Sequence, residues 1–172
     1  MTVRHELGLG LVLLVPNGDP WQKRDRAVTP AAVRLEMVRA AAAGVPGLQV
    51  SDLEIRRPGP SYTLDTIADL RRDEPDLDIT VILGRDAFAL LPTWDRHDEL
   101  VAAVSLAVVD RPGQVVADDD PPFPATVVDM PRIDVSSSGL RRRVAEGRPV
   151  DVLVPPGVAA LIEHHRLYRG DR

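Results

Sequence analysis

The segment Ile79-Thr80-Val81-Ile82-Leu83-Gly84-Arg85-Asp86 decides the expected fold. Its first five residues are aliphatic or β-branched, which predicts a strand buried on both faces, as in a parallel sheet. The glycine ends the strand, so Asp86 stands at the carboxyl end, where open α/β sheets bind ligands. There Asp86 can accept ribose hydroxyls or neutralise a metal, or it can cap a short helix over residues 87–91. The residues alone leave both roles open.

Strands and helices alternate along the chain on both sides of this segment. Short aliphatic runs predict further extended pieces at residues 11–15, 48–50, 53–55 and 106–109. Helices are expected after two threonines in the cap position, Thr29 and Thr63, and after Pro155-Pro156. Such alternation is typical of an open parallel α/β sheet with flanking helices. We therefore expect one α/β domain that spans residues 1–172.

The composition bounds the class of protein. The 172 residues are 44% hydrophobic and only 3% aromatic, which suits one core of aliphatic side chains. The chain contains no cysteine, so disulfides and thiolate metal sites are excluded. A net charge of -5 argues against binding to a nucleic-acid backbone. The apolar run at residues 9–15 is too short to cross a bilayer, so we expect a soluble cytoplasmic protein that does not contact the membrane.

A second unusual segment is Asp134-Val135-Ser136-Ser137-Ser138-Gly139-Leu140-Arg141-Arg142-Arg143. Leu140 is followed four residues later by a valine, which predicts one face of a helix that starts at the serines. The unpaired N–H groups of its first turn, with Ser137, Ser138 and Arg141, suit a chain of phosphates. A plainer interpretation is a serine cap on a surface helix with solvated arginines, and the segment by itself favours it.

Two loop residues complete the candidate set. Lys23 is the single lysine of the chain, and it lies in a proline-rich loop after the strand expected at residues 11–15. Trp94 follows Pro92, and its ring can stack on a flat ligand or form a partly buried lid over the core. Three aspartates at 118–120 are interpreted as part of a solvated loop rather than as metal ligands. Because parallel strands end at one edge of a sheet, we expect Lys23, Trp94 and the serines to meet there.

Taken together, these motifs resemble those of the bacterial nicotinate-nucleotide adenylyltransferases of the nucleotidyltransferase superfamily. Their order and spacing agree from about residue 11 to residue 168. The matching pieces are Val15-Pro16, Pro20-Trp21-Gln22-Lys23, Gly59-Pro60-Ser61-Tyr62-Thr63 with Asp65-Thr66, Gly84-Arg85-Asp86-Ala87, Pro92-Thr93-Trp94, Arg111-Pro112-Gly113 and the serine segment. Several separated motifs in register are a specific signal, although each alone is weak.

The resemblance implies a Rossmann-like fold and a reaction of NAD biosynthesis. AMP would pass from ATP to nicotinate mononucleotide, giving deamido-NAD and pyrophosphate, with Mg²⁺ accompanying ATP and no resident metal site in the chain. By position, the residues that would bind the ATP phosphates are Ser137, Ser138, Arg141 and Lys23. Transfer of this kind depends on in-line positioning and neutralised charge more than on a protein nucleophile.

For the acceptor, the resemblance implies four further roles. Asp86 would bind the nucleotide, and Trp94 would stack on the nicotinate ring. The backbone amides near Thr63 and Asp95 would read the ring carboxylate. Backbone amides suit an anion, so they would disfavour the neutral amide of nicotinamide mononucleotide.

One motif of the family is not found in the sequence. Family members begin with a strand and a G-T-F-D-P-x-H-x-G-H loop whose histidines contact the ATP phosphates, and no such loop occurs here. We therefore expect an N-terminally truncated domain without its first strand and with impaired activity, and we identify no catalytic residue. Two alternatives are a nucleotide-binding remnant without turnover, and a related adenylyltransferase acting on nicotinamide mononucleotide or phosphopantetheine. The oligomeric state stays open, a homo-oligomer included.

Overall fold

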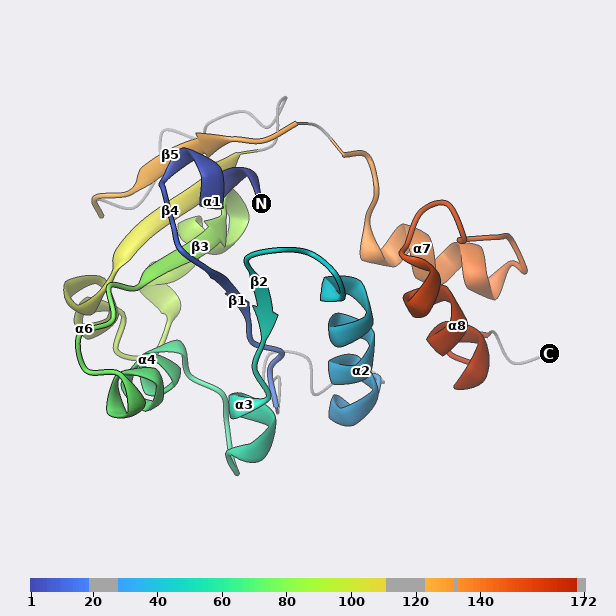
Figure 1. The fold of residues 1–172 in the computed structure, drawn as a ribbon, viewed down its shortest axis with the longest axis horizontal. Coiled ribbons are helices and arrows are strands. Elements are labelled where there is room, and N and C mark those ends of the chain that lie inside the picture. The colour runs from blue at the N-terminus through green and yellow to red at the C-terminus, as the bar shows by residue number, and fades with distance from the viewer. Residues whose placement is uncertain (19–27, 111–122, 132, 170–172) are drawn as a thin grey trace. The chain divides into compact units, whose positions relative to one another are not determined.

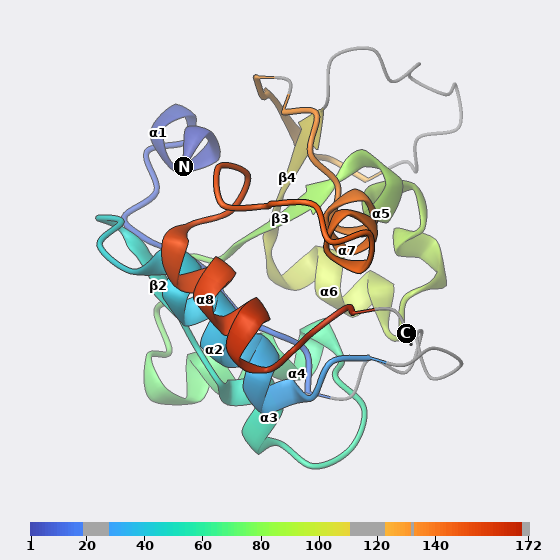
Figure 2. The ribbon, with the colours of Figure 1, turned by 90° about the vertical axis from the view of Figure 1, so that its right-hand side faces the viewer.

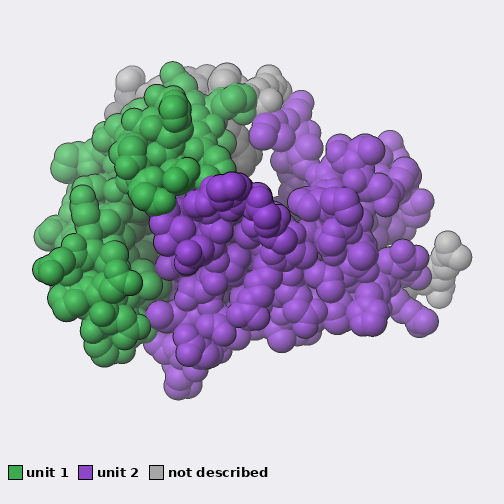
Figure 3. Space-filling view, viewed as in Figure 1, with its two compact units in different colours: residues 1–10, 61–132 green, residues 11–60, 133–172 purple. Residues whose placement is uncertain are grey.

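The computed structural model describes residues 1–18, 28–110, 123–131 and 133–169 (Figure 1). The chain divides into two compact units (Figure 3). Unit 1 consists of Met1–Gly10 and Ser61–Arg132, and unit 2 of Leu11–Pro60 and Ile133–Arg172. Each unit is described by itself, and a single domain over residues 1–172 stays a prediction.

Unit 1 is built on a parallel sheet with the strand order β3-β4-β5. Its strands are β3 (Thr80–Gly84), β4 (Ser105–Asp110) and β5 (Thr126–Asp129). Its helices are α1 (Thr2–Glu6), α4 (Thr63–Asp73), α5 (Arg85–Ala89), the 3₁₀ helix η2 (Leu91–Thr93) and α6 (His97–Ala103). A helical crossover through α5, η2 and α6 joins β3 to β4 and returns the chain to the same end of the sheet, which accounts for the parallel pairing of these two strands.

Strand β4 forms the centre of unit 1 because its side chains alternate between two cores. Leu106 and Val108 pack on one side with α4, α5, η2 and α6, through a buried cluster that includes Leu91 and Leu100. Ala107 packs on the other side with Val3 of α1 and Val128 of β5. Helices therefore cover both faces of the sheet and exclude water from Leu106, Ala107 and Val108 in the middle of β4.

Unit 2 combines a short sheet with a group of helices. Strand β1 (Val12–Leu14) pairs in parallel with β2 (Leu48–Val50). The helices are α2 (Ala31–Ala42), α3 (Leu53–Arg56), α7 (Ser137–Ala145) and α8 (Pro156–His164). Helix α8 lies alongside α2 (Figure 2), and Val158 and Ile162 of α8 are buried together with Val150. Gly157 permits this approach, since an added Cβ there would lie 3.2 Å from the Cβ of Ala40.

The predicted class, parallel strands flanked by helices, is confirmed by both units. Two strands are less buried than their sequences predict. All residues of β1 are half-buried, and in β3 only Leu83 is buried, while Ile82 is 36% exposed. Both strands lie at an edge of their sheets among the described residues. The aliphatic runs thus predicted the strands correctly but not how deeply they are buried.

Residues 53–55, expected to be extended, form helix α3 instead. Asp52 is the N-cap residue, and its carboxylate pairs with Arg56 one turn later at 2.9 Å. The Ser51 hydroxyl accepts a hydrogen bond from the backbone N–H of Leu53 at 3.2 Å. These local polar bonds decide the conformation, because a segment of three residues with two apolar side chains is too short to distinguish a strand from a helical turn.

The predicted helix caps are also corrected. Helix α2 has Pro30 at its N-cap rather than Thr29, and α4 has Tyr62 rather than Thr63. Helix α5 begins at Arg85 after the N-cap Gly84, so Asp86 lies in the first turn and is not the cap. In none of the three does a side chain cap the helix. Among the described residues, no helix has both the length and the apolar character needed to cross a bilayer.

Candidate active site

Asp86 lies directly after β3, as the sequence predicts. Strand β3 ends at Gly84, and the next two residues open α5, whose buried Phe88 holds the helix on the core. The Asp86 side chain is exposed in the first turn of α5. A carboxylate in this position faces solvent at the carboxyl end of a parallel strand, where a ligand hydroxyl can reach it.

Trp94 is held by the short helix η2. Leu91 at its start is fully buried, and the Leu91 carbonyl accepts a hydrogen bond from the Trp94 N–H at 2.9 Å. The Thr93 hydroxyl donates to the Leu90 carbonyl at 2.7 Å, which closes the same turn. The Trp94 side chain is half-buried and packs against the core of unit 1. Its side chain is thus anchored on the core, as a partly buried lid would be, while part of it stays accessible. Stacking of the ring on a ligand stays a prediction.

Asp95 and the start of α4 are joined by Arg96. The Arg96 guanidinium donates through Nη2 to Asp65 Oδ1 at 2.6 Å and through Nε to Asp95 Oδ2 at 2.8 Å. The hydrogen bond that Arg96 donates to Asp95, and then the one it donates to Asp65, raise the pKa of Arg96 above its usual value. Thr63, whose backbone amide is a predicted ligand, is the first residue of α4, two positions before Asp65. Arg96 therefore ties two predicted recognition segments together.

The sequence did not reveal this role of Arg96. Asp65 appears among the family-like motifs, but its partner lies 31 positions further along the chain. No spacing rule pairs such distant residues, since helical neighbours are three or four apart. Only the packing of α4 against α6 brings them together.

Helix α7 carries the serine segment. Ser136 is the N-cap, and its hydroxyl accepts a hydrogen bond from the Gly139 N–H at 3.1 Å. Ser137 and Ser138 form the first turn with exposed side chains, and Arg141 is exposed one turn later. The serine cap of the plainer interpretation is therefore present, and it leaves the next two serines and Arg141 accessible.

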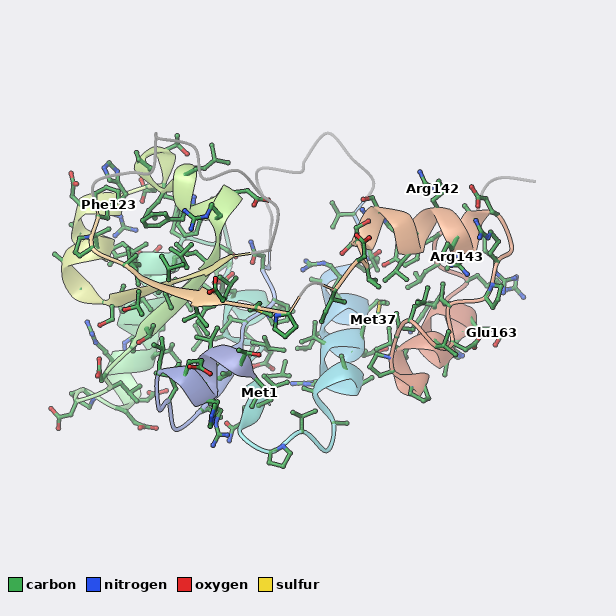
Figure 4. All side chains as sticks on the ribbon, turned by 90° about the horizontal axis from the view of Figure 1, so that it is seen from above. Met1, Met37, Phe123, Arg142, Arg143 and Glu163 are labelled. Carbon is green, nitrogen blue, oxygen red and sulfur yellow. The ribbon has the colours of Figure 1, made fainter. Side chains whose placement is uncertain are left out.

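The arginines of α7 differ in their surroundings. Arg143 donates two hydrogen bonds to the Pro149 carbonyl, at 3.0 Å from Nη2 and 3.3 Å from Nε. It therefore closes the turn that follows α7. Arg142 is exposed and projects from the outer side of the helix (Figure 4). Leu140 faces the buried cluster of α8, which confirms the predicted apolar face.

Lys23 lies outside the described residues, as do the aspartates at 118–120. Arg34 of α2 binds two described residues of the flanking chain, Gly18 and Thr29. Arg34 Nη2 donates to the Gly18 carbonyl at 3.1 Å, and Nε donates to the Thr29 carbonyl at 3.1 Å. Sequence reasoning missed Arg34, because a side chain that binds backbone carbonyls leaves no residue pattern.

The candidate residues are divided between the two units. Thr63, Asp86, Trp94 and Asp95 belong to unit 1, and Ser137, Ser138 and Arg141 to unit 2. Within unit 1, the structure connects Asp95 to the start of α4 through Arg96. That all these residues line one site stays a prediction.

Comparison with known proteins identifies the family. A family profile described as cytidylyltransferase-like matches residues 1–143. A protein of Saccharopolyspora erythraea, named "Probable nicotinate-nucleotide adenylyltransferase", is 42% identical over 170 residues, which are 98% of this chain and 80% of the relative. A Streptomyces coelicolor protein of the same name is 41% identical and covers 98% of this chain and 90% of its own length. The chain belongs to the nicotinate-nucleotide adenylyltransferase family.

Solved structures of similar fold include adenylyltransferases. A Plasmodium falciparum nicotinic acid mononucleotide adenylyltransferase complexed with NaAD superposes with a TM-score of 0.72, at 17% identity, covering 98% of this chain and 91% of that chain. An adenylyltransferase structure from Vibrio parahaemolyticus gives 0.68 at 19% identity, covering 99% and 85%. At such identities the likeness concerns the fold alone. The predicted Rossmann-like fold is confirmed, and family membership makes the chain a nucleotidyltransferase.

Proposed function

We propose that the chain transfers AMP from ATP to nicotinate mononucleotide, forming deamido-NAD and pyrophosphate in NAD biosynthesis. The observation that carries the proposal is identity of about 40% to nicotinate-nucleotide adenylyltransferases over nearly the whole chain. In the reaction, a phosphate oxygen of the mononucleotide attacks the α-phosphorus of ATP. The bond from this phosphorus to the bridging oxygen of the β-phosphate breaks, and pyrophosphate leaves.

The roles of the ATP-binding residues follow from the start of α7. Backbone N–H groups of a helical first turn point towards an anion, and the helix dipole adds a partial positive charge. We assign the binding of the ATP phosphates to the amides and hydroxyls of Ser137 and Ser138, with Arg141 and Lys23 as cationic partners. These groups neutralise the charge that develops on pyrophosphate as it leaves.

Features of unit 1 support the proposed roles of the residues that bind the acceptor. Trp94 offers an anchored, partly accessible ring for stacking on nicotinate. The backbone amides near Thr63 and Asp95 donate to the ring carboxylate, and Asp86 accepts from the nucleotide. Amide donors favour the carboxylate over a neutral amide, which itself carries N–H donors.

Mg²⁺ is proposed to arrive with ATP. It binds nucleotides largely through phosphate oxygens and keeps several of its waters. Within residues 1–18, 28–110, 123–131 and 133–169, no three His, Cys, Asp or Glu side chains gather at one point. We assign no step of the reaction to a protein-bound metal. We place the enzyme in the cytoplasm, where ATP and the mononucleotide are available.

A coupled assay of pyrophosphate release tests the proposal. The chain is supplied with ATP, Mg²⁺ and either nicotinate or nicotinamide mononucleotide. We expect turnover with the acid, at the impaired rate expected without the G-T-F-D-P-x-H-x-G-H loop. The kcat/KM for the amide should be at least about tenfold lower, because the N–H donors of its carboxamide would face the backbone N–H donors of the site. Preference for the amide or for phosphopantetheine would assign a related adenylyltransferase. Nucleotide binding without pyrophosphate release would assign a remnant.

Replacing Trp94 by leucine is expected to raise the KM for nicotinate mononucleotide about tenfold, since stacking on an aromatic side chain is worth about 1–3 kcal/mol. The KM for ATP should change less than about twofold, because stacking concerns the acceptor only. Leucine keeps an apolar side chain against the core, where Trp94 packs. Trp94→Phe retains a ring and is the matched control. Equal changes in both KM values would contradict the stacking role.

Replacing Arg141 by glutamine is expected to raise the KM for ATP about tenfold, as a charge-assisted bond to phosphate is lost. Arg142→Gln removes the neighbouring charge of the same helix, and it should change this KM less than about twofold. Both side chains are exposed, so the two variants should be equally stable, which thermal unfolding checks. The same KM in both variants would show that Arg141 acts only through general charge.

A further inference from the structure

Arg96 connects two segments that are distant in the sequence and that both carry predicted ligands of the acceptor carboxylate. Its guanidinium lies 2.6 Å from Asp65 in the first turn of α4 and 2.8 Å from Asp95, its neighbour in the turn after Trp94. Two donors of one rigid fork are thus used on two segments at once. A planar guanidinium fixes the distance between its partners more tightly than a flexible ammonium does.

The backbone of Arg96 is held in an unusual conformation. Its φ of 49° and ψ of 40° lie in the left-handed region, which costs energy for any residue with a Cβ. Arg96 is the N-cap of α6, and its carbonyl accepts a hydrogen bond from the N–H of Leu100 at 3.0 Å. Leu100 is buried in the core of unit 1. The core therefore anchors the residue whose side chain reaches to α4.

The positive charge of Arg96 also offsets the negative charge of its two partners. Asp65 and Asp95 are both half-exposed carboxylates, and they stand beside the amides to which we assign the nicotinate carboxylate. Without a cation between them, two negative charges would repel an anionic acceptor. The guanidinium of Arg96 is charged throughout the neutral range, as that of any arginine is.

We propose that Arg96 is a positioning residue for the acceptor, which holds the Trp94–Asp95 turn against the first turn of α4 and neutralises the two aspartates beside the carboxylate site. The inference rests on the proposed function and deepens it. Arg96 touches neither reacting atom and acts through the placement of backbone amides and of Trp94. It thereby contributes to the discrimination between the acid and the amide mononucleotide.

Isothermal titration calorimetry of the full chain tests the inference without requiring turnover. Nicotinate mononucleotide, nicotinamide mononucleotide and Mg²⁺-ATP are titrated into the wild type, Arg96→Gln and Arg96→Lys. For Arg96→Gln, the Kd of the acid is expected to rise about tenfold, because misplaced donors and unscreened charge act together. The Kd of ATP should change less than about twofold, since ATP does not occupy this site. The Kd of the amide should rise by less than that of the acid, about threefold, because the amide shares the stacking on Trp94 but presents no carboxylate. Lysine restores the positive charge but not the planar guanidinium with its two donors. For Arg96→Lys, the rise in log Kd for the acid should therefore be about a third smaller than for Arg96→Gln.

Helix α4, which carries Asp65, also supplies a matched control. Arg72 pairs with Asp69 at 2.7 Å, so Arg72→Gln removes an exposed arginine–aspartate pair of α4 near its other end. Its Kd values should equal those of the wild type within about twofold, as exposed ion pairs contribute little. If Arg96→Gln weakens all three ligands equally, or behaves as Arg72→Gln, the positioning role is wrong. If the wild type binds the acid no more tightly than the amide, the proposed function itself fails.

Discussion

Replacing Leu91 by alanine is expected to lower the free energy of unfolding by about 2–5 kcal/mol, the largest effect of any single substitution proposed for this chain. The Leu91 side chain has no exposed surface and packs in the cluster formed by α4, α5, α6 and two strands. Truncation removes buried methyl groups and leaves a cavity that rigid neighbours fill only in part. Urea denaturation followed by circular dichroism measures the change.

The neighbouring leucine supplies the control for this experiment. Leu90 is 58% exposed, so Leu90→Ala should change the free energy of unfolding by less than about 0.5 kcal/mol. The two variants remove the same atoms at adjacent positions, and only burial distinguishes them. Because the buried Leu91 side chain anchors the turn whose carbonyl binds the Trp94 N–H, Leu91→Ala is expected to weaken acceptor binding as well. Equal unfolding free energies for the two variants would show that Leu91 is not a core residue.

The second large effect is expected at Gly18. A Cβ added there would overlap the carbonyl oxygen of Glu54 and lie 3.0 Å from its carbonyl carbon and 3.3 Å from the Cα of Ile55. All three are backbone atoms of α3, which cannot rotate away as a side chain would. Gly18→Ala should therefore force the chain apart at this contact and cost about 1–3 kcal/mol of unfolding free energy.

Gly10→Ala is the matched control for this substitution. An added Cβ at Gly10 meets no atom within 4 Å, so this variant should be neutral or slightly more stable, through a smaller entropy of the unfolded chain. The Gly18 carbonyl, five positions before Lys23 in the sequence, also accepts a hydrogen bond from Arg34. If Lys23 binds ATP, Gly18→Ala should raise the KM for ATP in addition. A stability equal to that of Gly10→Ala would contradict the close contact with α3.

The sequence predicted the order and type of the main elements around the candidate residues better than their caps and short segments. The strand before Asp86, the turn before Trp94 and the helix after the serines all lie where the patterns place them. The caps Thr29 and Thr63 and the extended piece at residues 53–55 were wrong. Such errors arise because caps and short segments are decided by a few hydrogen bonds, for which several neighbouring residues compete.

The residue order by itself determined the α/β class, the family and the set of candidate ligands. These depend on hydrophobic periodicity and on motifs in register, both of which are local or repeated properties. The tertiary structure alone decided that Arg96 joins Asp65 to Asp95, that Arg34 binds both Gly18 and Thr29, and that Leu91 rather than Leu90 is buried. The physical reason is that such contacts form between residues brought together by packing. Their strength depends on distance and burial, which the order of residues along a chain does not contain.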